Sequence, residues 1–511
     1  MNVPLRLVRL VAMLAAAALV ALMPVPAQAA DGYPPISGSG STWSQNALDQ
    51  WRKNVASNMT VNFSGTGSSA GRTDFINQTV DFAVSEIPFQ DKPEDGSPPE
   101  KPPVSFSYMP IVAGGTSLMY NLKIGGKRVT NLRLSGEVIA KIFTGQISKW
   151  NDAAIAKENP ALSMPDRPIT PVYRSDGSGT SAQFTKWMSD QYPSIWTQGM
   201  RSQFPAANAT FKGQSGSLGV AGYVSQNYGE GAITYVEYSY AMKSGFPVVK
   251  VLNKAGYYVE PTYQSVAVAL MSATINPDLT QNLGGVYNST DPRSYPMSSY
   301  SYMIVPTQPT KVFTAEKGKT LSAFGSYMLC VGQQQASSLG YSPLPMNLVA
   351  EGFRVLASLP GTTVSADGWN QCDNPNADNK LAASAPQPAE CDKQGDKQCT
   401  SGTGGAQQDT PATGAGGGGS ATKGGSTAGA STESGAVAPA VAAEAAVTDT
   451  GDTEGLAAAG ANAAVSSPFT LPEDGWGTPQ SIMLAAGLLL IAAILVPPLV
   501  MRRPRSDPRQ K

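Results

Sequence analysis

Three short loops rich in glycine, serine and threonine constrain the fold of this 511-residue chain more than any other feature. They occupy residues 36–43, 64–71 and 174–181. Each loop comes after a short strand-like run and opens a segment whose apolar side chains recur with helical spacing. This alternation predicts an α/β fold, in which such loops gather at the carboxyl ends of the strands, where ligands bind.

The loop at residues 174–181, Arg-Ser-Asp-Gly-Ser-Gly-Thr-Ser, has the chemistry of an anion-binding turn. Its glycines let successive backbone N–H groups point one way, and the helix that follows adds the positive end of its dipole. Arg174 adds a planar cation suited to an oxyanion, while Ser178 and Thr180 add hydroxyl groups. The alternative is an ordinary N-capped turn with Asp176 or Ser178 as the cap, and this loop alone does not decide between the two.

A carboxylate joins these donors, because the strand predicted at residues 80–86 ends in Glu86. Hydroxyls, backbone N–H groups and one arginine would donate hydrogen bonds to a tetrahedral oxyanion. A carboxylate can only accept, so it requires a proton on the ligand. The combination therefore favours a partly protonated oxyanion.

Composition excludes several kinds of chemistry. The chain contains no histidine, which excludes Ser-His-Asp hydrolysis, Cys-His nucleophiles and histidine-ligated metal sites. Residues 67–71 match the G-x-S-x-G pattern of hydrolases, but without histidine that interpretation is weak. We expect no enzyme, catalytic residue, metal or cofactor. Between its two basic ends the chain is mildly acidic, which argues against nucleic-acid binding.

These motifs together resemble the phosphate-binding proteins of bacterial ABC importers, the PstS family, over roughly residues 35–360. Besides the features above, the resemblance includes residues 142–152 and 233–238. It implies a type II periplasmic-binding-protein-like α/β fold with two lobes, a double-crossover hinge and a ligand cleft. It also implies a monomeric receptor that captures inorganic phosphate and delivers it to ABC permease subunits. A surface-anchored phosphate sensor or adhesion protein that keeps this fold is the alternative.

The resemblance also implies which residues bind the phosphate. They are Thr42, the backbone of Trp43, Ser68, Glu86, Arg174, Ser178, the backbone of Gly179, and Thr180, with Asp176 orienting Arg174. Two positions depart from the family. Trp43 stands where phenylalanine is common, which a backbone contact should survive. Glu86 stands where aspartate is common, so the acceptor is kept but reaches one methylene further.

The implied lobes divide a domain at residues 30–370. Lobe I would comprise about residues 30–115 and 290–370, and lobe II about residues 116–289. Residues 109–120 are expected to form a strand, a Gly-Gly turn and a second strand that hold the first crossover. Residues 297–305 would return the chain to lobe I.

Four cysteines occur late in the chain, three of them in an extension at residues 371–400. An even number in an exported protein suggests disulfides. Pairing Cys330 with Cys372 would tie the last helical region to the extension, and pairing Cys391 with Cys399 would close a small loop. The sequence leaves the connectivity open.

Both ends of the chain predict export and anchoring. Residues 1–29 have the basic start, apolar run and small-residue cleavage site of a signal peptide. Residues 401–480 are rich in Gly, Ala, Ser and Thr and predict a disordered linker. The apolar run at residues 481–500 predicts a transmembrane helix, with residues 501–511 as a basic cytoplasmic tail.

This arrangement would hold the receptor on the extracellular face of the cell membrane. Residues 471–475, Leu-Pro-Glu-Asp-Gly, resemble the L-P-x-T-G signal of wall-anchored proteins. Asp474 replaces the threonine at which that chemistry occurs. We therefore expect membrane anchoring, with wall attachment as the alternative.

Overall fold

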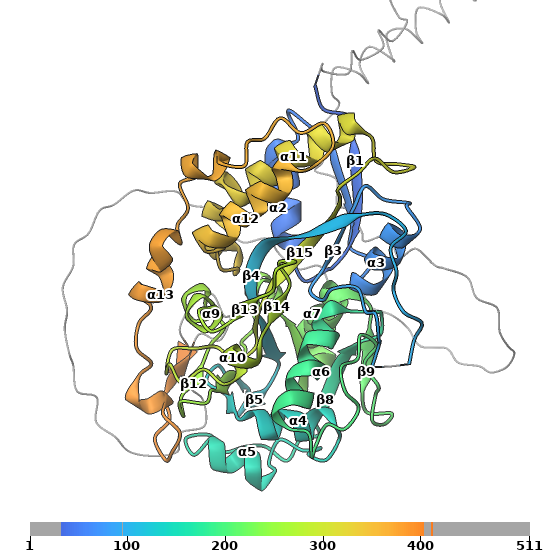
Figure 1. Ribbon diagram of the computed structural model, residues 1–511. Helices are drawn as coiled ribbons and strands as arrows, with labels where there is room; N and C mark the ends of the chain where they lie inside the picture. Colours follow the sequence, from blue (N-terminus) through green and yellow to red (C-terminus); the bar gives the residue numbers. More distant parts are fainter. Residues whose placement is uncertain (1–31, 95, 403–409, 412–511) are drawn as a thin grey trace, which may run out of the picture. The chain divides into compact units, whose positions relative to one another are not determined.

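The computed structural model describes residues 32–94, 96–402 and 410–411 (Figure 1). The predicted signal peptide, transmembrane helix and basic tail lie outside these residues, as does nearly all of the linker. Among the residues described, no helix combines the length and the apolar character that crossing a membrane requires.

One sheet of eight strands organises the domain, in the order β2-β1-β3-β15-β4-β10-β8-β9. Strands β1, β2 and β3 pair in parallel, and so do β10, β8 and β9. We call the part built on the first three strands lobe I and the part built on the last three lobe II. The strands are β1 (Ile36–Gly40), β2 (Val61–Ser64), β3 (Phe82–Ser85), β4 (Phe106–Tyr120), β8 (Thr170–Arg174), β9 (Lys212–Gln214), β10 (Ala232–Glu237) and β15 (Ser298–Pro306).

Two long antiparallel strands, β4 and β15, join the lobes (Figure 1). Along Phe106–Gly115 strand β4 pairs with β15, and from Thr116 to Tyr120 it pairs with β10 instead. Strand β15 also pairs with β3. The chain therefore passes from lobe I to lobe II in β4 and returns in β15, which is the double crossover that the family resemblance implies.

The Gly-Gly turn predicted inside residues 109–120 is wrong, because β4 is one continuous strand of 15 residues. Its two glycines instead permit close packing on both faces. A Cβ atom at Gly114 would lie 2.6 Å from the Trp43 ring, and one at Gly115 would lie 2.7 Å from Cβ of Pro261. Glycine is required at these two positions because Trp43 and Pro261 pack closely against the strand, and not because the chain reverses direction there.

The helices that follow the strands form where apolar side chains share one face. Helix α2 (Gln45–Val55) buries Ala47, Leu48, Trp51 and Val55. Helix α6 (Gly179–Gln191) buries Phe184, Trp187 and Met188, as the helical spacing of these residues predicts. The other helices are α3 (Ser68–Ile76), α4 (Gly136–Phe143), α5 (Ala153–Glu158), α7 (Gly216–Ser225), α8 (Tyr238–Ser244), α9 (Tyr263–Leu270), α10 (Gly284–Tyr287), α11 (Ala315–Leu329), α12 (Met346–Ala357) and α13 (Lys380–Ser384).

Short elements complete the described chain. The small strand pairings are β5 (Lys123–Ile124) with β6 (Lys127–Arg128), β11 (Lys250–Leu252) with β7 (Arg133–Leu134) and β12 (Tyr258–Val259), β13 (Thr274–Ile275) with β14 (Gln281–Asn282), and β16 (Ser401–Gly402) with β17 (Thr410–Pro411). The 3-10 helices are Asn227–Gly229, Val331–Gln335, Ser337–Leu339, Gly368–Gln371, Ala377–Asn379 and Glu390–Asp392. Strands β16 and β17 fall in the stretch for which the sequence predicts a disordered linker.

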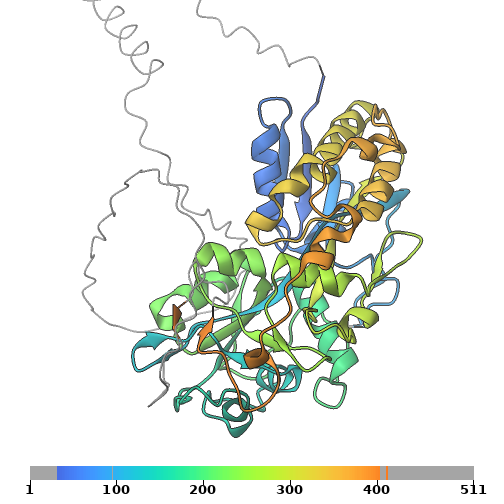
Figure 2. The same ribbon diagram turned by 90° about the vertical axis from the view of Figure 1, so that its left-hand side faces the viewer.

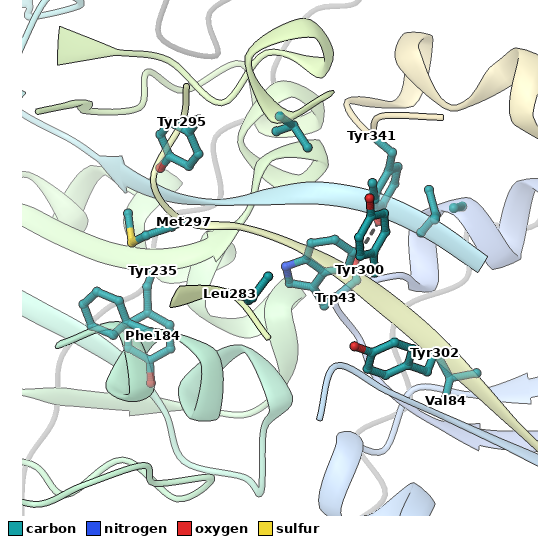
Figure 3. Close-up of a cluster of buried hydrophobic side chains, with 14 of the residues drawn as sticks. Trp43, Val84, Phe184, Tyr235, Leu283, Tyr295, Met297, Tyr300, Tyr302 and Tyr341 are labelled. Carbon is teal, nitrogen blue, oxygen red and sulfur yellow. Dashed lines mark hydrogen bonds between the residues drawn. The ribbon is translucent and has the colours of Figure 1, made fainter. Parts of the chain in front are cut away.

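Aromatic side chains pack along the crossover (Figure 3). Trp43, which precedes α2, meets Tyr341 edge-on at 5.7 Å between ring centroids. In lobe II, Phe184 of α6 stacks on Tyr235 of β10 at 4.6 Å. These rings hold the first turns of α2 and α6 against the strands, and both helices begin at a predicted ligand loop.

Both cysteine pairs form disulfides, Cys330 with Cys372 and Cys391 with Cys399. This is the pairing that would tie the last helical region to the extension and close a small loop. The extension, residues 371–400, belongs to the described part of the chain and packs against both lobes.

Candidate functional site

The three Gly/Ser/Thr loops meet between the lobes. The Ser69 N–H of lobe I donates to the Gly177 carbonyl of lobe II at 3.1 Å. A Cβ atom at Gly179 would lie 2.2 Å from Glu86 Oε2 and 2.6 Å from Ser68 Oγ. The predicted ligands at residues 68, 86 and 179 therefore lie together, although they come from opposite lobes.

Arg174 ends β8, is buried, and is held by Asp176. Its Nε donates to Asp176 Oδ1 at 2.7 Å, and its Nη2 donates to Oδ2. Burial alone would raise the pKa of the Asp176 carboxyl, but the hydrogen bonds and charge of Arg174 lower that pKa below its ordinary value. Asp176 also accepts from the Gly216 N–H at 3.0 Å. The guanidinium is thus fixed in place, with Nη1 directed toward Ser217 Oγ at 3.3 Å.

Glu86 follows β3 and is almost completely buried, with 1% of its surface exposed. Ser68 Oγ donates to its Oε2 at 2.8 Å, and Ser301 Oγ donates to its Oε1 at 3.0 Å. Burial raises the pKa of the Glu86 carboxyl, while hydrogen bonds from three serines and the charge of Arg174 oppose that rise. The site therefore contains a buried acceptor whose orientation is set by serine hydroxyl groups.

The first turn of α6 contributes Ser178, Gly179 and Thr180. Ser178 Oγ accepts from the Ser181 N–H at 3.1 Å, so Ser178 is the N-cap, as one interpretation of the loop predicts. The cap does not exclude an anion site, because the Ser178 hydroxyl can still donate its own proton. Thr180 Oγ1 is buried and has no hydrogen-bond partner among the described residues. A buried hydroxyl without a partner is unusual, and here it lies at the N-terminus of a helix of 13 residues.

Thr42 and Trp43 lie at the start of α2. Thr42 Oγ1 lies 2.8 Å from Ser217 Oγ and accepts from the Ser217 N–H at 3.1 Å, which joins the two lobes directly. The Trp43 N–H donates to Ser41 Oγ at 2.9 Å. A ligand that uses the Trp43 N–H would have to replace this internal hydrogen bond.

Sequence reasoning missed several serines of this site, among them Ser217 and Ser301. Ser217 begins α7 and contacts both Arg174 and Thr42. A signal for it existed, since Ser217 comes directly after a Gly/Ser loop, in the first turn of the helix that follows. Ser301 comes from the crossover strand β15 and had no comparable signal, because this strand contains three serines and nothing in the sequence distinguishes Ser301 from the other two.

The arrangement can hold a small anion that carries a proton. Its donors are hydroxyls, the α6 N-terminus and one fixed guanidinium, and its acceptor is Glu86. In the part of the chain that the structure describes, no three Cys, Asp or Glu side chains gather in a way that could hold a metal ion.

Two α/β lobes joined by two crossover strands, with a candidate anion site between them, define a two-lobed binding protein. Comparison with known proteins supports this class. The family model of the PBP superfamily domain matches residues 25–331. The chain therefore belongs to the PBP superfamily.

Within that superfamily the relatives are named phosphate-binding proteins. The chain is 35% identical over 322 residues to "Phosphate-binding protein PstS" of Xylella fastidiosa (strain Temecula1), an alignment that covers 62% of this chain and 83% of the relative. It is 31% identical over 330 residues to "Phosphate-binding protein PstS 2" of Mycobacterium tuberculosis, with 63% of this chain and 86% of the relative covered. The chain is a member of the PstS family.

A solved structure of the phosphate binding protein from Stenotrophomonas maltophilia is also similar. It shares 17% sequence identity, with 66% of this chain and 98% of that chain covered and a TM-score of 0.48.

Proposed function

We propose that this protein is an extracytoplasmic receptor that captures inorganic phosphate between its lobes and delivers it to an ABC importer. The observation that carries the proposal is the buried Glu86 acceptor, which lies against Gly179 at the N-terminus of α6. The fixed Arg174 and the unpartnered Thr180 hydroxyl belong to the same loop and helix start. Membership of the PstS family supports the identity of the anion.

In this proposal most of the phosphate-binding residues donate hydrogen bonds and one accepts. Thr42, Ser68, Ser178 and Thr180 donate through their hydroxyls, Trp43 and Gly179 through their N–H groups, and Arg174 through its guanidinium. Glu86 accepts the proton that phosphate carries. We add Ser217 as a residue that positions the side chains of Thr42 and Arg174 relative to each other.

We also propose that the receptor acts as a monomer at the outer face of the membrane. The support for the location is the sequence of the two ends: a predicted signal peptide at residues 1–29, and an apolar run at residues 481–500 followed by basic residues. About 70 residues between β17 and residue 480 would connect the domain to that anchor, and a coil of this length spans on the order of 45 Å.

Isothermal titration calorimetry of the purified chain with phosphate, arsenate and sulfate tests the proposal. Phosphate and arsenate should bind at one site per chain, and sulfate should bind far more weakly. Arg167→Ala is the matched control for variants of Arg174, because Arg167 is 41% exposed and pairs with Glu230 away from the site. Absence of any phosphate binding would contradict the proposed function.

A further inference from the structure

The C-terminal extension crosses from lobe I to lobe II outside the crossover strands. We call residues 372–400 the strap. It begins beside α11 and α12 and runs down one side of the molecule to lobe II, as its orange trace shows (Figure 2). The match to the superfamily model ends at residue 331, so the strap lies beyond the matched region.

The strap is attached to lobe I at its start. The disulfide between Cys330 and Cys372 ties it to the end of α11. Asn374 Nδ2 donates to the Leu344 carbonyl at 3.0 Å, and Asn376 Nδ2 donates to the Pro343 carbonyl at 3.2 Å. Both asparagines are buried, so this anchor is part of the packed structure.

In its middle the strap packs beside the crossover. Ala382 and Ala385 bury their methyl groups against Ala267 and Val268 of α9. Arg293 Nη1 donates to the Ala382 carbonyl at 2.9 Å. Helix α9 in turn contacts both β4 and β15. The strap is therefore held close to the two strands about which the lobes would rotate.

On lobe II the strap ends in a ring that surrounds a buried arginine. The disulfide between Cys391 and Cys399 closes the ring. Arg133 Nη1 donates to the carbonyls of Cys391 (3.1 Å) and Lys397 (2.6 Å), and its Nη2 donates to that of Gly395 (2.8 Å). Lys250 Nζ adds an ion pair with Asp392 at 2.9 Å. One guanidinium thus satisfies three carbonyl groups of the ring, which makes the attachment specific.

We propose that the strap is a third connection between the lobes and limits how far they separate. In a two-lobed receptor the lobes rotate about the crossover strands. Here the lobes touch across the site, through Thr42 and Ser217, while the strap is attached at both ends and in the middle. A rotation that separates the lobes changes the distance between the strap's end anchors, and a strap that keeps all of its anchors limits that rotation. The ligand-free chain therefore opens through a smaller angle than its two crossover strands would allow.

A pair of nitroxide labels can report the opening directly. Lys53 of α2 and Lys243 of α8 are exposed and line one groove of about 690 Å³ between the lobes, so Lys53→Cys with Lys243→Cys places a label on each side. An insert of about twelve Gly and Ser residues, spanning on the order of 20 Å as a coil, would slacken the strap between Gln387 and Pro388. The matched control carries the same insert after Thr400, beyond the ring.

Pulsed electron resonance on the full-length chain without phosphate then compares the label distances. The proposal predicts a longer and broader distance distribution for the insert at Gln387 than for the control. Identical distributions would overturn it. If the insert variant does not fold, a protease site at residues 386–389, cut after folding, replaces it, and an unchanged distance after cleavage would likewise overturn the proposal. No ligand enters the measurement, so its result is separate from that of the phosphate titration.

Discussion

Replacing Glu86 by glutamine should remove most of the discrimination between phosphate and sulfate. Near neutral pH phosphate carries a proton that it can donate, whereas sulfate of similar shape carries none. Glu86 is buried and receives hydrogen bonds from Ser68 and Ser301, so it cannot turn away from the ligand without losing both. When sulfate is bound, the negative Glu86 carboxylate therefore faces only sulfate lone pairs, because sulfate has no proton to donate to it.

The size of the effect follows from the burial of Glu86. Two unit charges about 4 Å apart repel by about 4 kcal/mol at the effective dielectric constant of about 20 that suits protein sites. Phosphate is also an anion, but its proton offsets this repulsion by donating a hydrogen bond to the carboxylate, which sulfate cannot do. Left uncompensated for sulfate, a penalty of that size corresponds to a factor of roughly 1,000 in dissociation constant. The glutamine amide can donate a hydrogen bond to sulfate, so Glu86→Gln should lose most of this factor. Glu86→Asp is the control and should keep it, because the acceptor remains.

Calorimetry at one ionic strength measures the ratio of the sulfate and phosphate dissociation constants for wild type, Glu86→Gln and Glu86→Asp. Burial raises the pKa of Glu86, so protonation at low pH should also weaken the discrimination in wild type but not in Glu86→Gln. An equal phosphate-to-sulfate ratio in wild type and Glu86→Gln at neutral pH would refute the role of Glu86 as the filter.

Three further variants test other parts of the account. Arg174→Ala should lose roughly 2–5 kcal/mol of phosphate binding, because a buried anion loses its charged partner, while Arg167→Ala should lose none by calorimetry. Burial raises the pKa of Glu237 well above 4.5, so folding takes up a proton; unfolding free energy should fall as pH rises from 4.5 through the raised pKa. Urea unfolding measured at several pH values should show that the unfolding free energy of Glu237→Gln depends less on pH than that of wild type. An unchanged pH dependence would be inconsistent with a raised pKa at Glu237. A chain that ends at residue 411 should fold and bind phosphate as the full chain does; lost binding would show that the remaining residues contribute.

The fold class could be predicted from the sequence, and so could the positions of the three Gly/Ser/Thr loops that meet in the candidate site. Loops of glycine and hydroxyl residues between strands and helices can be recognised from their local sequence, and the structure places them between strands and helices as predicted. The pair of Arg174 and Asp176 lies within one loop, two residues apart, so its geometry could be anticipated. The helix faces of α2 and α6 follow directly from apolar spacing.

Features that depend on distant packing could not be predicted in this way. The pair Gly114 and Gly115 has the composition of a turn, and only the positions of Trp43 and Pro261 show why glycine is needed in a straight strand. Ser301 reaches Glu86 from 215 residues away, and nothing in its own segment marks it.

The strap shows the same limit. The cysteines indicated disulfides, but Arg133 lies 258 residues before Cys391, and no local pattern connects that arginine to the ring. Its role depends on a tertiary contact between a short strand of lobe II and the extension that follows the last long helix.

A crystal structure of the protein grown with phosphate is the most direct test of the central claim. The account predicts a tetrahedral anion between the lobes that accepts hydrogen bonds from Thr180 Oγ1 and the Arg174 guanidinium and approaches Glu86 through its protonated oxygen. An anion bound elsewhere, with Thr180 Oγ1 and Arg174 not in contact with it, would contradict the account.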